Sequence, residues 1–335
     1  MAPYEHPDRL VEPSSLPLPL RRELLVTATS FMRNPELCEE LAQRLAGHTI
    51  HYLDVRDPLQ HARLQDPLFT ERIAAWLVGG EPVSATELKA FPALLGVSKY
   101  GVGVDNIDFQ ACAERGVQVH FEAGVNSLAV AEHTLGLILG MCRNICMNSR
   151  MLSLGIWNKN GGRSVSGMKI GIIGLGHVGS KLARLLRGLG ADLAYCDILA
   201  KPELENELGI QRLSYHDLIS WAELLSFHVP LTDQTRRMFG DAELARTRPG
   251  VFLINTSRGP VLVQETLKKG LTGGHIQGAA LDVFESEPLR DKELAESERL
   301  VGTPHTAGNS EQAVRAMGQA AIRGLEAFFL TKSKI

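Results

Sequence analysis

The chain has 335 residues, of which 44% are hydrophobic and 22% are charged, and its formal net charge is −3 at pH 7. This composition is typical of a globular protein with room for two domains. The small, scattered charge gives no electrostatic reason to bind nucleic acid, and the longest strongly apolar stretch, 134–142, is too short to span a membrane. Five cysteines without C-x-x-C spacing indicate a reducing compartment, so we expect a cytoplasmic protein without a bound metal.

The first third of the chain alternates short apolar runs with helical patterns. The apolar runs predict strands at 23–28, 50–55, 74–78 and 94–97, and the periodicity predicts helices at 35–45 and 85–90. Strands that alternate with helices imply a parallel sheet covered on both faces. The proline-rich residues 1–21 are expected to form a loose leader on the surface.

A long helix is expected next, at 127–146. It is apolar nearly all round, so we expect it to be buried on more than one side, between domains or against a second subunit. Further strands are predicted at 169–173, 191–196, 224–228, 251–255 and 278–283, and a final amphipathic helix at 311–329 is long enough to return to the first domain. The expected fold class is α/β, with doubly wound parallel sheets.

The stretch 169–179, K-I-G-I-I-G-L-G-H-V-G, is the most specific motif. Gly174 permits a tight turn, Gly176 lets the backbone approach a pyrophosphate, and Gly179 lets helix and strand pack closely. Asp197 ends the following strand, where its carboxylate can accept hydrogen bonds from the ribose hydroxyls. No Arg follows at positions 198 and 199, so the motif predicts a Rossmann unit that binds NAD in preference to NADP.

Three further residues suggest acid–base chemistry on a carboxylate substrate. Arg258 follows the strand at 251–255, where a guanidinium can bind a carboxylate bidentately. Glu287 and His305 each follow a later apolar run, and as a pair the carboxylate would orient the imidazole and raise its pKa. Such a group suits the reduction of an α-keto acid, although the spacing alone leaves open whether the three residues meet.

These motifs together resemble those of the D-isomer-specific 2-hydroxyacid dehydrogenases. The resemblance runs from about residue 22 to the C-terminus and rests on separated motifs in the right order: KYGVGVDNID at 99–108, NSLAVAEH at 126–133, the glycine motif at 171–179, SFHVPLTDQT at 226–235, INTSRG at 254–259, AALDVFESEP at 279–288 and TPHTAG at 303–308.

The resemblance implies a discontinuous, flavodoxin-like substrate domain, 1–123 and 313–335, with an inserted Rossmann NAD-binding domain, 124–312. It implies that these domains close on the ligand and that the helix at 127–146 supports a homodimer. Catalytic roles are implied for Arg258, Glu287 and His305. Cofactor contacts are implied for Gly174, Gly176, His177, Val178, Gly179, Asp197, His228, Val229, Pro230, Thr235, Thr256, Ser257, Asp282 and Gly308. Substrate contacts are implied for Lys99, Tyr100, Val102 and Gly103.

The substrate stays open at this point. The motif sequences are most similar to those of 3-phosphoglycerate dehydrogenases without the C-terminal regulatory domain. Those enzymes often present two basic residues to the phosphate; here Lys99 occupies one such place, and Gly79 and Gly80 occupy the other. Phosphoglycerate, hydroxypyruvate, glyoxylate and bulkier acids are all compatible with the motifs. The alternative function is an NADH-sensing interaction protein of the same fold, similar to the family's transcriptional corepressors.

Overall fold

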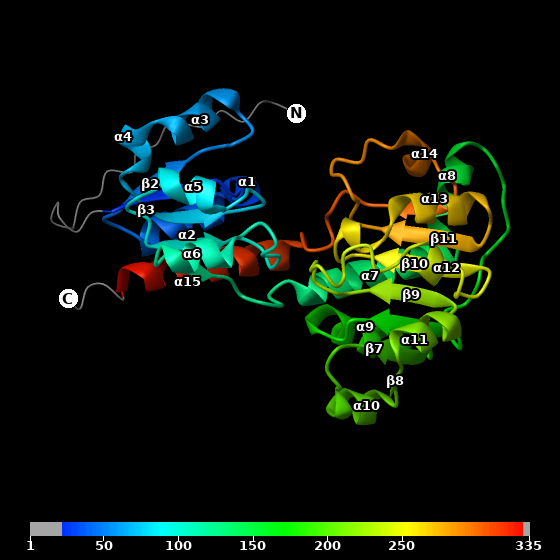
Figure 1. The fold of residues 1–335 in the computed structure, drawn as a ribbon. Helices are drawn as coiled ribbons and strands as arrows, with labels where there is room; N and C mark the ends of the chain where they lie inside the picture. The colour runs from blue at the N-terminus through cyan, green and yellow to red at the C-terminus, as the bar shows by residue number, and fades with distance from the viewer. Residues whose placement is uncertain (1–21, 331–335) are drawn as a thin grey trace. The chain divides into compact units, whose positions relative to one another are not determined.

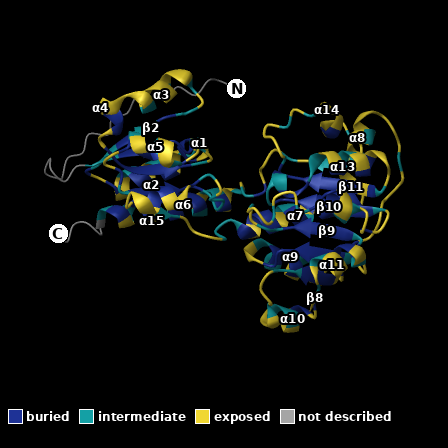
Figure 2. Ribbon diagram, in the orientation of Figure 1, coloured by how far each residue is buried: buried dark blue, intermediate teal, exposed yellow. Residues whose placement is uncertain are grey.

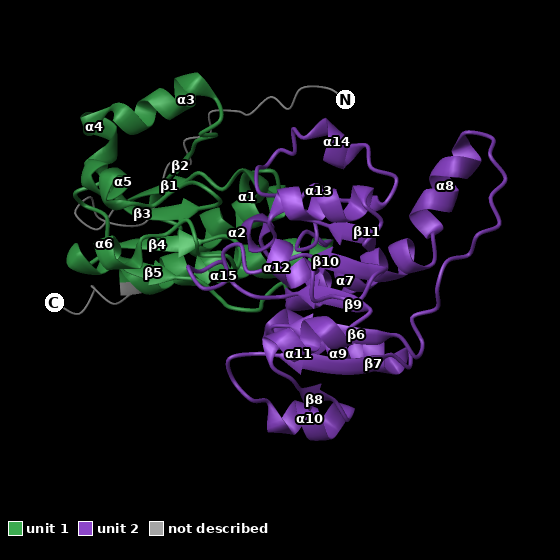
Figure 3. Cartoon of the chain, turned by 45° about the vertical axis from the view of Figure 1, so that its right-hand side comes forward, with its two compact units in different colours: residues 1–126, 311–335 green, residues 127–310 purple. Residues whose placement is uncertain are grey.

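The computed structural model describes residues 22–330, so the leader expected at 1–21 lies outside the described residues. The chain forms two compact units: unit 1 comprises 1–126 and 311–335, and unit 2 comprises 127–310 (Figure 3). The boundaries expected from the sequence, after residues 123 and 312, lie within three residues of these. Each unit is built on a parallel sheet and has its own core.

Unit 1 contains a five-stranded sheet in the order β2-β1-β3-β4-β5, with all neighbours parallel. This order is that of a flavodoxin-like doubly wound sheet. The strands are β1 (Glu23–Val26), β2 (Thr49–Tyr52), β3 (Ile73–Val78), β4 (Gly96–Lys99) and β5 (Gln118–His120). The helices are α1 (Thr29–Met32), α2 (Pro35–Arg44), α3 (Pro58–Ala62), α4 (Pro67–Thr70), α5 (Ala85–Ala90), α6 (Phe109–Glu114) and α15 (Glu311–Leu330).

Alternating strand residues serve the two faces of this sheet. In β1, Leu24 and Val26 pack with α2 and α15, whereas Leu25 packs with α5 and α6 on the other face. Both sets are buried, which explains why the strands read as continuous apolar runs (Figure 2).

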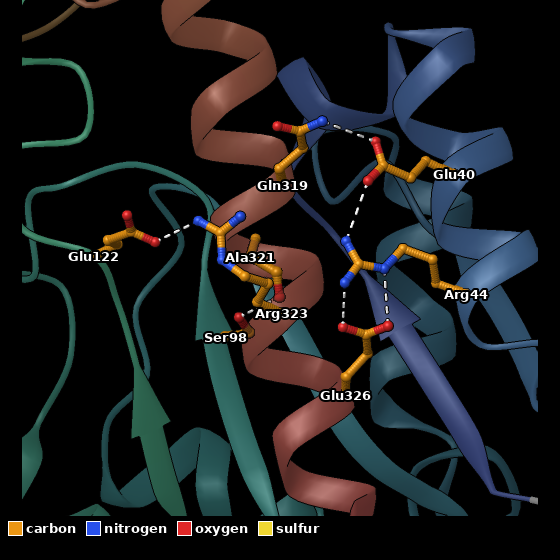
Figure 4. A network of polar contacts seen from close by, with 8 residues as sticks. All are labelled: Glu40, Arg44, Ser98, Glu122, Gln319, Ala321, Arg323 and Glu326. Atoms are coloured by element: carbon orange, nitrogen blue, oxygen red, sulfur yellow. Dashed lines mark hydrogen bonds and ion pairs between the residues drawn. The ribbon is translucent and has the colours of Figure 1, made fainter.

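The last helix, α15, completes unit 1 although it is distant in sequence. Apolar side chains of α15 lie in the same core as Leu24 and Val26. Polar contacts, one at the surface and one in the interior, also hold α15 in unit 1 (Figure 4). The guanidinium of Arg44 donates to both carboxylate oxygens of Glu326 at 2.8 and 2.6 Å, and the hydroxyl of Ser98 donates to the carbonyl of Ala321 at 2.7 Å. The chain therefore returns to its first domain to finish it.

Unit 2 contains a seven-stranded parallel sheet in the order β12-β11-β10-β9-β6-β7-β8. Counted within the unit, this is the Rossmann order, and the switch point lies between β6 and β9. The strands are β6 (Lys169–Ile173), β7 (Asp192–Cys196), β8 (Gln211–Arg212), β9 (Leu224–Phe227), β10 (Val251–Asn255), β11 (Ile276–Leu281) and β12 (Leu300–Gly302). The helices are α7 (Ser127–Cys142), α8 (Ile145–Ser153), α9 (His177–Gly188), α10 (Pro202–Leu208), α11 (Tyr215–Trp221), α12 (Asp241–Leu244), α13 (Gln264–Thr272) and α14 (Lys292–Ala295) (Figure 1).

The two faces of the unit 2 sheet bury different helices. Phe252 and Ile254 of β10 pack with α7 and α9, whereas Val251 and Leu253 pack with α11 and α13. The sheet is therefore covered on both faces. In such a sheet, ligands bind beyond the carboxyl ends of the strands. The α/β, doubly wound fold predicted from the sequence is confirmed for both units.

One predicted element is wrong: the helix expected at 127–146 is broken. α7 ends at Cys142 and α8 begins at Ile145, because Asn144 between them adopts a left-handed backbone with φ of 54°. The following loop holds this break, since the N–H of Arg163 donates to the carbonyl of Cys142 at 2.7 Å. That bond depends on a segment about 20 residues away, so helical periodicity could not reveal it.

Within residues 22–330, none of the helices combines the length and the apolar character needed to cross a bilayer. All five cysteines are free thiols. The described part of the chain also holds no cluster of His, Cys, Asp and Glu arranged to bind a metal ion.

Candidate active site

The glycine turn after β6 brings a helix N-terminus to the switch point of unit 2. Gly174 has φ of +92°, which favours glycine, and a Cβ there would overlap the carbonyl of His228 in the loop after β9. A Cβ on Gly179 would overlap the carbonyl oxygen of Gly174, so only glycine lets α9 approach the turn this closely. The turn therefore lies directly beside the loop that follows β9.

The start of α9 fits the diphosphate of a dinucleotide. The helix begins after Gly176 with no side-chain cap, and Gly176 and His177 are exposed. A Cβ built on Gly176 meets no atom within 4 Å, so the space in front of the helix N-terminus is open. Uncapped N–H groups and the positive end of the helix dipole favour a phosphate at this position.

Asp197 lies at the end of β7, beside the same turn. Its carboxylate accepts hydrogen bonds from the N–H groups of Leu175 at 2.7 Å and Leu199 at 2.9 Å. Each oxygen keeps a second lone pair, with which it can accept a ribose hydroxyl. Sequence analysis missed Arg212 of β8, which donates to the carbonyls of Asp197 at 2.8 Å and Ile198 at 3.2 Å. The residues around Asp197 fit the adenosine ribose of NAD, and the guanidinium of Arg212 lies close to them.

The loop after β9 carries a histidine that stays neutral. Nε2 of His228 lies 2.8 Å from the hydroxyl of Ser226, and burial lowers the pKa of His228 to about 3. Its neighbours Val229 and Pro230 continue the loop, and the hydroxyl of Thr235 donates to the carbonyl of Pro230 at 2.5 Å. His228 therefore serves this loop as a neutral hydrogen-bonding group rather than as an acid.

The loop after β10 presents Arg258. The side chain of Asn255 organises it: its oxygen accepts from the N–H and the hydroxyl of Ser257 at 3.0 and 2.7 Å, and its amide donates to the carbonyl of Arg258 at 2.9 Å. Gly259 follows, and a Cβ there would overlap the backbone of Phe284. The Arg258 turn is thus packed against the loop that carries Glu287.

Glu287 and His305, whose meeting the spacing left open, lie in contact. Nδ1 of His305 lies 2.7 Å from Oε2 of Glu287, and the side chain of His305 is half exposed. This hydrogen bond raises the pKa of His305 and outweighs burial, which lowers it. Burial raises the pKa of Glu287, but the bond to His305 and nearby positive charge outweigh it, so the pKa of Glu287 lies below its usual value. The charge of Arg258 acts on both groups, which places all three within electrostatic reach.

Asp282 organises the loop on which His305 lies. Its carboxylate is fully buried and accepts from the N–H groups of Thr306 at 2.8 Å and Ala307 at 2.9 Å, and its carbonyl accepts from the N–H of His305 at 2.8 Å. His305 itself has φ of 54°, a left-handed conformation that is uncommon outside glycine, although histidine adopts it more often than most residues. Asp282 therefore holds a left-handed backbone at the predicted acid–base residue. Gly308 follows in the same loop, partly exposed.

The predicted substrate residues lie in unit 1, around the ends of β3 and β4. The side chain of Lys99 is buried, and its ammonium donates to the carbonyl of Gly79 and to Oδ1 of Asn106, the latter at 2.9 Å. Val102 and Gly103 are partly exposed in the loop after β4. The ring of Tyr100 packs edge-on against Phe31 in the core, with centroids 5.8 Å apart, and burial raises its pKa to about 12.

Within unit 2, the fold brings most predicted residues to neighbouring strand ends. Sequence reasoning missed the side chains that hold these loops, above all Asn255 and Thr303. Asn255 stands in the INTSRG motif and Thr303 in the TPHTAG motif, so the motifs contained the signal but not the bonding pattern.

The chain is similar to known dehydrogenases in sequence and in fold. The family model "D-isomer specific 2-hydroxyacid dehydrogenase, NAD binding domain" matches residues 135–307. A glyoxylate reductase of Korarchaeum cryptofilum is 34% identical over 255 residues, 74% of this chain and 77% of that protein. A D-3-phosphoglycerate dehydrogenase of Mycobacterium tuberculosis is 36% identical over 233 residues, 69% of this chain but 44% of the relative. The structure of a 2-hydroxyacid dehydrogenase from Ketogulonicigenium vulgare is similar with a TM-score of 0.79 and 28% identity, covering 92% of this chain and 95% of that one.

Proposed function

Because the chain belongs to the D-isomer specific 2-hydroxyacid dehydrogenase family and is an NAD-dependent oxidoreductase, we propose that His305 is its acid–base residue and that Arg258 binds the substrate carboxylate. The observation that carries this proposal is the 2.7 Å hydrogen bond between His305 and Glu287. The bond to Glu287 raises the pKa of His305, which favours the protonated ring that a keto-acid reductase uses. His228 is excluded from this role, because its pKa is too low.

The mechanism follows from these assignments. NADH, when bound, supplies a hydride to C2 of the keto acid. The guanidinium of Arg258 binds the carboxylate bidentately and orients the carbonyl. Since Nδ1 of His305 is bonded to Glu287, Nε2 is the ring nitrogen left to deliver the proton to the carbonyl oxygen. In the reverse direction, Nε2 takes the hydroxyl proton of the D-2-hydroxy acid.

The cofactor contacts implied by the resemblance stay part of this proposal. Gly174, Gly176, His177, Val178 and Gly179 would hold the diphosphate, which the open space before α9 supports. Asp197 would bind the adenosine ribose. The remaining proposed contacts are His228, Val229, Pro230, Thr235, Thr256, Ser257, Asp282 and Gly308. In unit 1, the N–H groups of Val102 and Gly103 are proposed to bind the substrate carboxylate.

We further propose that the substrate carries no phosphate, as in glyoxylate or hydroxypyruvate. The support is the bonding of Lys99, whose side chain is buried and whose ammonium already donates to Gly79 and Asn106. At least two of its three N–H donors are thus engaged by the protein, and Gly79 and Gly80 offer no second cation. The loops at the ends of β3 and β4 therefore hold a structural lysine more readily than a phosphate site.

One assay tests both proposals: NADH oxidation followed at 340 nm with glyoxylate, hydroxypyruvate, 3-phosphohydroxypyruvate and bulkier 2-keto acids. We expect turnover with the small unphosphorylated acids and its loss in a His305→Gln variant that still binds NADH. If the wild-type protein reduces none of these acids, the proposed reduction of a 2-keto acid is wrong. A preference for the phosphorylated acid of more than tenfold would overturn only the substrate assignment.

We also propose that the homodimer expected through 127–146 forms at the end of that region, through α8 and the loop after it. Several large apolar side chains are exposed there: Ile145 is 57% exposed, Leu152 59%, Leu154 68% and Trp157 77%. A cluster of this kind is typical of a protein–protein interface. Light scattering on a Leu154→Glu, Trp157→Glu variant tests it, since the wild type should have twice the mass of the variant. Equal masses would contradict the interface.

A further inference from the structure

Two consecutive residues of α7, His133 and Thr134, reach two different loops of the candidate active site. α7 begins at Ser127, where unit 2 itself begins, and it packs along one face of the sheet. One residue contacts the loop that carries His305, and the other contacts the loop that carries Arg258. Neither His133 nor Thr134 is among the proposed catalytic, cofactor-binding or substrate-binding residues.

The first connection runs from His133 to the His305 loop. Nε2 of His133 lies 3.0 Å from the hydroxyl of Thr303, and that hydroxyl donates to Oδ1 of Asp282 at 2.6 Å. Because the single hydroxyl hydrogen of Thr303 goes to the carboxylate, Nε2 of His133 must be the donor in the other bond. Asp282 in turn accepts the N–H groups of residues 305–307. The imidazole of His133 thus closes a network whose other end is the left-handed backbone of His305.

The second connection runs from Thr134 to the Arg258 loop. The hydroxyl of Thr134 donates to the carbonyl of Val130 at 2.6 Å and lies 2.8 Å from the hydroxyl of Thr256. Its own hydrogen is used within the helix, so Thr256 is the donor. Both threonines are buried, and Thr256 lies two residues before Arg258. This bond therefore fixes the start of the turn that Asn255 completes.

We propose that His133 and Thr134 are positioning residues: through Thr303 and Asp282, and through Thr256, they hold the His305 loop and the Arg258 loop in register on a single rigid helix. This inference rests on the proposed function, because it takes His305 and Arg258 as the residues to be positioned. Helix α7 offers a firm reference, since much of its length is buried in the core of unit 2. Catalysis depends on such register, because a shift of about 1 Å can lower a rate roughly a hundredfold.

The test uses the full-length protein and variants of each connection. His133→Ala and Thr303→Val interrupt the first, Thr134→Val interrupts the second, and Thr134→Ser retains the hydroxyl. Glu132→Ala is the matched control, because Glu132 is the preceding, exposed residue of the same helix. Steady-state kinetics with the best 2-keto acid is combined with NADH titration and with hydrogen exchange followed by mass spectrometry.

We expect the two connections to change different kinetic constants. His133→Ala and Thr303→Val should lower kcat by about tenfold to a hundredfold, and their double variant should be no worse than either alone. Thr134→Val should raise KM for the keto acid by about tenfold, and Thr134→Ser should restore it. The Kd for NADH should change less than kcat or KM does, because most of the proposed cofactor contacts lie outside these two loops, and Glu132→Ala should behave as the wild type.

Hydrogen exchange separates failure of this inference from failure of the proposed function. His133→Ala should speed exchange at residues 303–308 and Thr134→Val at 255–259, whether or not a substrate is found. If both variants exchange as the wild type does, or if kcat and KM change together in all of them, the inference is wrong. If the exchange pattern is as expected but the wild type reduces no 2-keto acid, the helix holds the loops and the proposed reaction is wrong.

Discussion

Three glycines of the α9 region allow cofactor binding to be separated from helix packing. Gly176 precedes the helix, Gly179 is in its first turn, and Gly188 is its last residue. An added Cβ meets no atom within 4 Å at Gly176 or Gly188, but at Gly179 it overlaps the carbonyl oxygen of Gly174. Gly176→Ala therefore fills the space before the helix, and Gly179→Ala disturbs the contact between the helix and the turn. Gly188→Ala does neither and serves as the control.

The structure gives the size of each effect. To restore an ordinary contact in Gly179→Ala, the turn and α9 must separate by about 1 Å. Such a shift weakens the N–H hydrogen bonds to a phosphate, and since a hydrogen bond to a charged group contributes about 1.5–3 kcal/mol, the loss of one raises the Kd for NADH by about tenfold to a hundredfold. Gly179→Ala should also lower Tm, because the displaced helix packs less well in the core.

Gly176→Ala gives the sharper result, because the free protein has room for the methyl group. The backbone at Gly176 is extended, with φ of −79° and ψ of −151°, so alanine is accepted without left-handed strain. We expect an unchanged Tm and a Kd for NADH raised by at least about tenfold, since the methyl group would occupy the position proposed for the diphosphate. Gly188→Ala should leave the Kd within twofold and stabilise the helix by up to about 0.5 kcal/mol.

Fluorescence titration with NADH and thermal melts of the three variants provide the measurement. The comparison with Gly188→Ala removes any general effect of a glycine-to-alanine change in this helix. If Gly176→Ala binds NADH as tightly as the wild type, the diphosphate does not lie before α9, and the reasoning from the open space at that glycine is refuted.

Three further predictions concern the proposed catalytic and cofactor residues. Glu287→Gln replaces the carboxylate that raises the pKa of His305 with a neutral acceptor, so the ring loses its proton at lower pH and the high-pH fall in reduction rate should move to lower pH; an unchanged pH profile would reject the pairing. Arg258→Ala should raise KM for the keto acid at least tenfold while the Kd for NADH stays nearly constant, and loss of NADH binding would instead assign Arg258 to the cofactor. Asp197→Ala should gain activity with NADPH because Arg212 lies beside the ribose side, and Asp197→Ala, Arg212→Ala should lose that gain; equal NADPH activity in the two variants would exclude Arg212.

Much of the fold could be predicted because the strands are buried on both faces. β3 and β10 are buried at every residue, so they appear as apolar runs bounded by polar segments. β8 is different: it consists of Gln211 and Arg212, both exposed, and only pairing with β7 makes it a strand. An edge strand of this kind carries no apolar signal, which is why the cation beside Asp197 was not foreseen.

The candidate site was predictable where backbone geometry dictates the residue. Gly174 and Gly179 are required by a positive φ and a close approach, and both requirements can be read from a motif. The hydroxyl and amide networks were not predictable, because their bonds join residues far apart in sequence. Thr134 and Thr256 are separated by 122 positions, and neither residue type indicates its partner.

Lys99 shows most clearly why substrate choice needs the structure. A lysine at a strand end, beside a glycine-rich loop, favours an anion site when only its residue type is known. Its side chain is buried, however, and its ammonium donates to a backbone carbonyl and to Asn106, so the charge is already engaged by the protein. The same residue type thus serves either as a ligand-binding cation or as a connection between two loops. The bonds of the ammonium, and not its position in the sequence, decide between them, and for Lys99 they favour a substrate without a phosphate.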